Sequence, residues 1–192
     1  SRRSAAPTDG RGRRTRGRPR ADESRDTRAD VIDAARVLFA TLGFDGTAMT
    51  AVADEASVSP TTVYHYFDDK AALYTAVFEA TAPLVWSNAN DGIRDAERVV
   101  EAIDLIVRNW AELERRCPGL TPFMLSVPRE ARLHPAFRPL LERRSELQDG
   151  AFRALAAFGR RTGELAALSE TDAFEFLRST VMGWIIEGHN RQ

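Results

Sequence analysis

The amino-acid sequence predicts an all-α protein, on the strength of three observations. Apolar residues recur at intervals of three and four through most of the chain after residue 27, the spacing that places them on one face of a helix. No segment shows the apolar and polar alternation of a half-buried strand. Glycine, proline and capping residues separate the periodic segments. Together these features indicate roughly nine helices and no sheet.

The first predicted helix begins near Thr27. Thr27 and Asp30 are placed as a capping pair, and the apolar positions that follow run from Val31 to Leu42 at helical spacing. Gly43 then stands where a residue with a left-handed backbone commonly ends a helix. The segment therefore predicts a helix of about four turns.

Two short helices are predicted next, from Met49 to Ala56 and from Pro60 to Phe67, with a tight turn between them. Ser59 is a preferred N-cap residue, and Pro60 occupies the first helical position, where its missing N–H has no partner to lose. The three residues between Ala56 and Pro60, which are Ser57, Val58 and Ser59, indicate a turn and the start of a new helix.

Longer helices are predicted for the rest of the chain. The first spans residues 69–87, with Pro83 bending or interrupting it. An apolar stripe from Val99 to Trp110 indicates the next, which a break at Pro118 and Gly119 follows. A short segment at residues 121–127, a helix over residues 134–159 and a last helix over residues 170–186 complete the prediction.

Composition and charge exclude several classes of protein. With 43% hydrophobic and 29% charged residues the chain is of ordinary globular type, and its apolar runs are far shorter than the roughly 18 residues of a membrane-spanning helix. We therefore expect a cytoplasmic location and no membrane partner. Cys117 is the only cysteine and the chain has three histidines, which predicts no disulfide, no metal site and no cofactor.

Positive charge is concentrated at the N-terminus. Residues 1–20 hold eight arginines and one aspartate, whereas residues 21–70 hold four basic and ten acidic residues. With almost no large apolar side chain, residues 1–24 are predicted to form a flexible arm. Two interpretations of the arm stay open: it is a solubilising tail, or it enters the minor groove of DNA.

Two short helices joined by a tight turn and flanked by longer helices are typical of a helix-turn-helix, whose second helix enters the major groove of DNA. Apolar positions such as Val52 and Val63 supply its small core, which leaves Thr61, Thr62, Tyr64 and His65 for the exposed face. Hydroxyl and imidazole groups can bond to base edges, and a tyrosine can reach a phosphate.

This segment resembles the TetR family of transcriptional regulators over residues 35–73. The positions that match the family's N-terminal pattern are Ala35, Leu38, Phe39, Gly43, Phe44, Thr47, Met49, Val52, Ala53, Ala56, Val58, Ser59, Thr62, Val63, Tyr64, Tyr66, Phe67, Lys70 and Leu73. The resemblance implies that the helix from Pro60 to Phe67 reads a palindromic operator, that Tyr64 and Lys70 hold phosphates, and that the protein acts as a homodimer.

Two positions depart from the family's pattern. Ser57 stands where glycine is usual in the turn, and a left-handed serine there would cost about 1 kcal/mol. Ala48 stands where a serine or threonine usually caps the second helix and touches a phosphate, a role that Thr47 or Thr50 would take over. The residues expected to contact DNA are Thr47, Thr50, Ser59, Thr61, Thr62, Tyr64, His65, Tyr66 and Lys70.

Three regions follow: a flexible Arg-rich arm at residues 1–24, a DNA-binding domain at residues 25–73, and a ligand-binding and dimerisation domain at residues 74–192. The resemblance implies a pocket for a small-molecule effector, and the aromatic and sulfur side chains expected to line it, which could also be plain core, are Trp86, Trp110, Phe123, Met124 and Phe152. Apolar stripes on the last two helices could be intramolecular core, and the resemblance implies that they form the dimer interface, made of Leu155, Phe158, Phe174, Leu177, Val181, Trp184 and Ile185.

These features favour a transcriptional regulator, most simply a repressor whose operator binding is controlled by a ligand. The alternative is a DNA-binding dimer that needs no ligand. A pocket of several hundred cubic ångströms between the C-terminal helices would favour the sensor, and a solid core would favour the plain dimer. An enzyme is not expected and no catalytic residue is assigned, because no Gly-rich phosphate loop, nucleophile–base pair or metal cluster follows residue 74.

Overall fold

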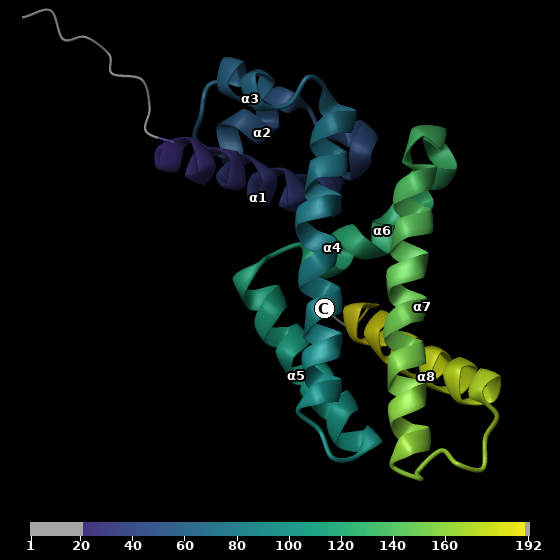
Figure 1. Ribbon diagram of the computed structural model, residues 1–192. Coiled ribbons are helices and arrows are strands. Elements are labelled where there is room, and N and C mark those ends of the chain that lie inside the picture. Colours follow the sequence, from purple (N-terminus) through teal and green to yellow (C-terminus); the bar gives the residue numbers. More distant parts are fainter. Residues whose placement is uncertain (1–20, 191–192) are drawn as a thin grey trace, which may run out of the picture.

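The structure, a computed structural model, describes residues 21–190, and the side chains of residues 26–184, 186 and 187. This part of the chain consists of eight α-helices and one short 3-10 helix, with no strand, so the predicted all-α class is confirmed (Figure 1). The elements are α1 Ala21–Gly46, α2 Met49–Glu55, α3 Pro60–Tyr66, α4 Lys70–Arg94, α5 Val99–Arg116, α6 Leu120–Leu133, η1 Pro135–Phe137, α7 Arg138–Arg161 and α8 Glu170–Asn190.

The first helix begins earlier than predicted. It starts at Ala21 rather than near Thr27, so it takes in the last four residues of the predicted arm, and residues 1–20 lie outside the described part. The break at Gly43 is confirmed, because this residue has φ 74° and interrupts the helical backbone before Gly46.

Two helices extend beyond their predicted ends at residues 87 and 127 and run through prolines. Helix α4 continues through Pro83 to Arg94, and α6 continues through Pro128 to Leu133. In both helices the residues next to the proline on the inner face, such as Val85 and Val127, are buried. Packing against neighbouring helices therefore keeps these helices continuous, although each proline removes one backbone hydrogen bond.

The helices form a head and a body that share one hydrophobic core (Figure 1). Helices α1 to α3 make the head, and α4 runs from the head into the body beside α5. Side chains of the head, of α4, of α6 and of η1 belong to this core, so the predicted boundary between residues 73 and 74 falls within it. A second core joins α5, α7 and α8.

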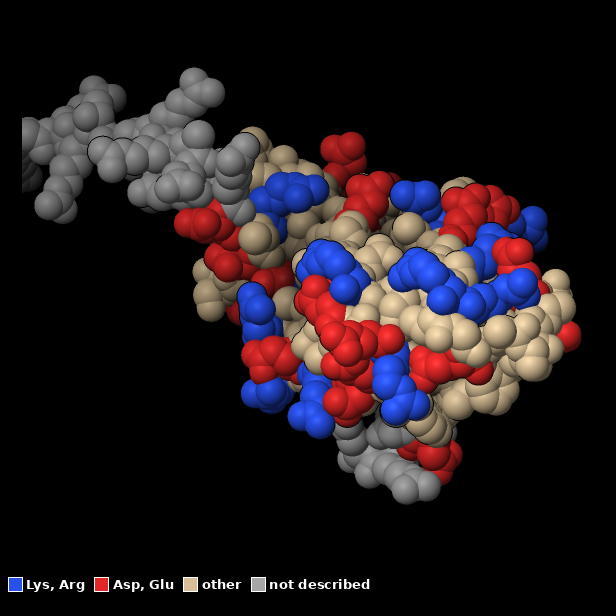
Figure 2. Space-filling view, turned by 60° about the horizontal axis from the view of Figure 1, so that its bottom comes forward, with Lys and Arg blue, Asp and Glu red and all other residues tan. Residues whose placement is uncertain are grey.

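None of the helices within residues 21–190 combines the length and the apolar character that crossing a membrane requires. On the face that Figure 2 brings forward, acidic and basic side chains are interspersed, and no large area carries one sign of charge.

The turn between α2 and α3 depends on a strained serine. Ser57 has φ 54°, its N–H donates to Asp54 O at 3.1 Å, and the next N–H, that of Val58, donates to Ala53 O at 2.9 Å. This pair of bonds is a Schellman motif, which normally has glycine at the left-handed position. The left-handed serine expected at position 57 is thus confirmed.

Ser57→Gly is expected to raise the free energy of unfolding by about 0.5 to 1 kcal/mol, because the strain that it relieves exceeds the backbone entropy that glycine adds to the unfolded chain. Urea denaturation measures the change. Ser57→Ala is the matched control, since alanine keeps the Cβ atom that causes the strain; an equal gain in both variants would contradict the explanation.

Candidate nucleic-acid interface

Helix α3 is held in place by a cap at its start and by one buried anchor. The Ser59 hydroxyl accepts a hydrogen bond from Thr62 N at 3.1 Å, and Pro60 occupies the first turn. Val63 is fully buried against the core of the head. Both features follow from local sequence, and together they orient the remaining side chains of α3 outward.

The exposed face of α3 consists of three of the predicted DNA-contacting residues. Thr61 and His65 are exposed, and Tyr64 is 53% exposed. Thr50 on α2 is also exposed. Polar side chains that can donate and accept hydrogen bonds are thus free to meet base edges or phosphates, as the prediction requires.

Thr62 and Tyr66, which were also predicted to contact DNA, make contacts within the head. The Thr62 hydroxyl lies 2.8 Å from the Ser59 hydroxyl, so it supports the start of α3. Tyr66 is half-buried, and its ring meets that of His65 edge-on with centroids 5.2 Å apart. Their contacts to DNA stay predictions, and here the side chains stiffen α3.

The prediction for Thr47 needs correction. Thr47 is 2% exposed, and its hydroxyl donates to Gly43 O at 2.8 Å, one turn back in the chain. A hydroxyl that is buried and bonded in this way presents nothing to a phosphate. Ala48 is the N-cap of α2 without a side-chain bond, so of the two proposed substitutes for the missing contact only Thr50 is exposed.

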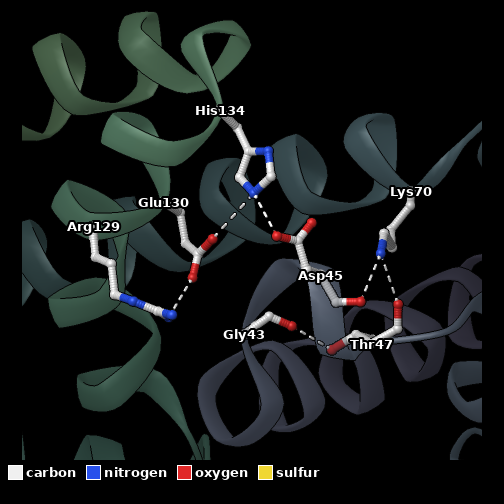
Figure 3. A network of polar contacts seen from close by, with 7 residues as sticks. All are labelled: Gly43, Asp45, Thr47, Lys70, Arg129, Glu130 and His134. Atoms are coloured by element: carbon white, nitrogen blue, oxygen red, sulfur yellow. Dashed lines mark hydrogen bonds and ion pairs between the residues drawn. The ribbon is translucent and has the colours of Figure 1, made fainter.

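Lys70 fastens the end of α1 to the start of α4. Its Nζ donates to Thr47 O at 3.0 Å and to Asp45 O at 3.4 Å, and lies 4.5 Å from the centre of the Phe44 ring (Figure 3). An ammonium group above an aromatic face and beside two carbonyls is stabilised by both. Lys70 therefore supports the loop between α1 and α2, in addition to the phosphate contact predicted for it.

On the other side of the same loop, a polar network connects the head to α6 (Figure 3). Asp45 Oδ2 lies 3.3 Å from Nε2 of His134, which lies 3.6 Å from Oε2 of Glu130. Glu130 is 2% exposed, and its Oε1 accepts a hydrogen bond from Arg129 at 3.0 Å. Sequence reasoning missed this network, because it ended the segment at Val127 and gave His134 only a surface or capping role.

The body encloses an apolar cavity between α4, α5, α6, α7 and α8. Its volume is about 60 Å³, so it is narrow. Four of the predicted pocket residues line it: Trp86, Trp110, Met124 and Phe152. Phe123 does not, because it packs in the shared core with its ring 5.1 Å from that of Tyr74.

The predicted dimer interface also needs correction. Leu155, Phe158, Leu177 and Val181 are buried in the second core of a single chain, so they offer no free surface. Trp184 is 59% exposed and Phe174 half-buried, whereas the side chain of Ile185 lies outside the described part.

A residue that the sequence analysis missed lies on the outer face of α8. Phe176 is 55% exposed, whereas its neighbour Leu177 is buried. Trp184 follows Leu177 by seven residues, so it continues the face of Leu177 toward the end of the helix, where it is 59% exposed.

Comparisons with known proteins relate the chain to bacterial regulators. Residues 31–77 match the family described as bacterial regulatory proteins, tetR family. Over 120 residues the chain is 24% identical to the HTH-type transcriptional regulator UidR of Escherichia coli (strain K12), a match covering 62% of this chain and 59% of UidR. The chain thus spans about three fifths of the length of this curated relative.

Solved structures share the fold. FadR from Bacillus subtilis, in complex with stearoyl-CoA, superposes with a TM-score of 0.61 at 18% identity and covers 84% of this chain and 88% of its own. AibR, in complex with isovaleryl coenzyme A and operator DNA, has a TM-score of 0.62 at 19% identity and covers 84% and 86% of the two chains.

Lys70→Ala is expected to lower the free energy of unfolding by about 1 kcal/mol, because two carbonyls and an aromatic face lose their cationic partner. Thermal or urea denaturation without DNA measures this. Glu79→Ala, at an exposed position of the same helix, is the control and should leave stability nearly unchanged. If the Lys70→Ala variant is as stable as the parent protein, the Lys70 side chain has no structural role.

Proposed function

We propose that the chain, whose residues 31–77 match the tetR family of bacterial regulatory proteins, is a transcriptional repressor that binds a palindromic operator as a homodimer under the control of a small-molecule ligand. The observation that carries this proposal is the capped, projecting α3, whose exposed Thr61, Tyr64 and His65 form a polar face suited to a major groove. AibR, similar in fold, is in complex with operator DNA.

The apolar cavity of the body supports a sensor over a DNA-binding dimer without a ligand, and at about 60 Å³ it is smaller than the several hundred cubic ångströms expected of an effector pocket. A solid body would have served dimerisation alone, whereas this one has an apolar space lined by Trp86, Trp110 and Met124. FadR from Bacillus subtilis and AibR are each in complex with an acyl-coenzyme A, so proteins of this fold accommodate small molecules.

Helix α6 offers a route from the cavity to the head. Its first turns supply Thr121 and Met124 to the cavity wall, and its last turns carry Glu130, whose Oε1 lies 3.3 Å from the position a Cβ atom would take at Gly43. A ligand that shifts α6 would therefore move the contacts of α1. Control of DNA binding requires that the ligand bind the two positions of the head unequally.

Dimerisation is assigned to the outer faces of α7 and α8. Phe176 and Trp184 are exposed aromatic residues on α8, and Ala154 and Ala157 are small exposed residues on α7. Small side chains let helices approach closely while the aromatic residues supply buried area. A two-fold axis here would place two copies of α3 in successive major grooves, about 34 Å apart.

Selection of bound sequences from random duplex DNA is expected to return a palindrome, and His65→Ala should alter the preferred base at one position in each half-site. The double variant that carries Thr61→Ala together with His65→Ala should show no fixed preference for a DNA sequence. Thr171→Ala, an exposed threonine on α8, is the matched control and should select the parental sequence. Failure of the parent protein to enrich any DNA at low salt would overturn the proposed function.

Trp184→Glu is expected to convert a dimer into a monomer at micromolar concentration, because a charge would be buried in the apolar interface of α8. Light scattering coupled to gel filtration measures the mass. Val100→Glu, at a position 68% exposed on α5, is the control and should remain dimeric. If the Trp184→Glu variant keeps the mass of the parental dimer, the dimer interface lies elsewhere.

A further inference from the structure

The wall of the cavity carries a single charge. Among the described residues that line it, Arg144 on α7 is the only ionised one, and most of the others are aliphatic, aromatic or methionine. The guanidinium is positioned by neutral acceptors: Nε donates to Met124 O on α6 at 3.1 Å, and one terminal nitrogen donates to the Gln148 side-chain oxygen at 3.1 Å. Its direction is thus set by two helices.

This arginine lacks a counter-charge. No carboxylate in the part of the chain described by the structure pairs with Arg144, and its two hydrogen bonds occupy two of its five N–H groups. Burial lowers the pKa of the Arg144 guanidinium, with no negative neighbour to raise it. Charges held away from water in proteins are generally paired, so an anion would suit the free N–H groups of this half-buried arginine.

A second unpaired donor points to the same chemistry. Trp86 lines the cavity, and its indole N–H is buried without an acceptor. The polar groups opposite are already satisfied among themselves, since the Trp110 indole donates to the Thr121 hydroxyl at 2.7 Å and that hydroxyl donates to Glu114. Both unsatisfied groups of the wall are therefore donors, which calls for a ligand with acceptor atoms.

We propose that the cavity binds an apolar carboxylate whose anionic group pairs with Arg144 while its hydrocarbon part fills the space between the aromatic side chains. This inference rests on the proposed function, for which it names the class of effector. A carboxylate fits better than a phosphate, because a single guanidinium in a narrow apolar space compensates one negative charge.

Matched pairs of ligands test the proposal on the full-length protein. We would titrate hexanoate against hexanol, decanoate against decanol, and phenylacetate against 2-phenylethanol, by calorimetry and by the fluorescence of Trp86 and Trp110. At least one carboxylate is expected to bind about tenfold or more tightly than its alcohol, the effect of a charge-assisted hydrogen bond. Arg144→Gln should remove this preference and leave alcohol binding unchanged.

Arg143→Gln is the matched control, because Arg143 is the exposed neighbour on α7 and pairs with Glu146 at the surface. It should keep the preference for carboxylates. Alcohols that bind as tightly as every matched carboxylate, a panel in which no carboxylate binds, or an Arg144→Gln variant that keeps the preference would each overturn the proposal. The comparison within the parent protein decides the question even if the variant does not fold.

A measurement of DNA binding distinguishes a failure of this inference from a failure of the proposed function on which it rests. If the protein prefers carboxylates but binds no DNA of any sequence, the proposed function fails and the assignment of Arg144 stands. If it binds a selected operator but shows no preference for carboxylates, the regulator stands and the assignment of Arg144 fails.

Discussion

The contact on which the arrangement depends is the packing of aromatic rings around Tyr74. Its ring lies 5.0 Å from that of Phe39 on α1, 5.1 Å from that of Phe123 on α6 and 4.4 Å from that of Phe137 in η1, measured between centroids. Burial raises the pKa of the Tyr74 hydroxyl to about 12, so the cluster stays uncharged. Head and body are therefore joined through a close-packed core, which deforms little, and not through a flexible linker.

A rigid junction has consequences for how a ligand could act. Because α6 belongs to the shared core and also to the wall of the cavity, it cannot move without displacing the rings around Tyr74 or the polar contact between Asp45 and His134. Such a junction favours two discrete positions of the head over a continuous range. Arg144 bonds directly to the backbone of α6 at Met124, so an anion that pairs with Arg144 would act at this helix.

Local rules of helix formation predicted much of the candidate interface. The Ser59 cap, Pro60 in the first turn and the left-handed Ser57 all concern hydrogen bonds or backbone angles within a few residues, which the sequence displays directly. The same rules ended two helices too early, at residues 87 and 127, because burial on the inner face outweighs the hydrogen bond lost at Pro83 and Pro128 and the helices continue.

The amino-acid order alone was enough for the all-α class, the helix-turn-helix and an apolar face on each long helix, because all three are periodic or local. It could not say which apolar side chains meet one another, so Phe123 and Leu177 were placed at a pocket and at an interface although both are core residues. Nor could it show that Thr47 turns inward or that Arg144 faces a cavity without a counter-ion. Those outcomes depend on distances between residues far apart in the chain, and these exist only once the helices have packed.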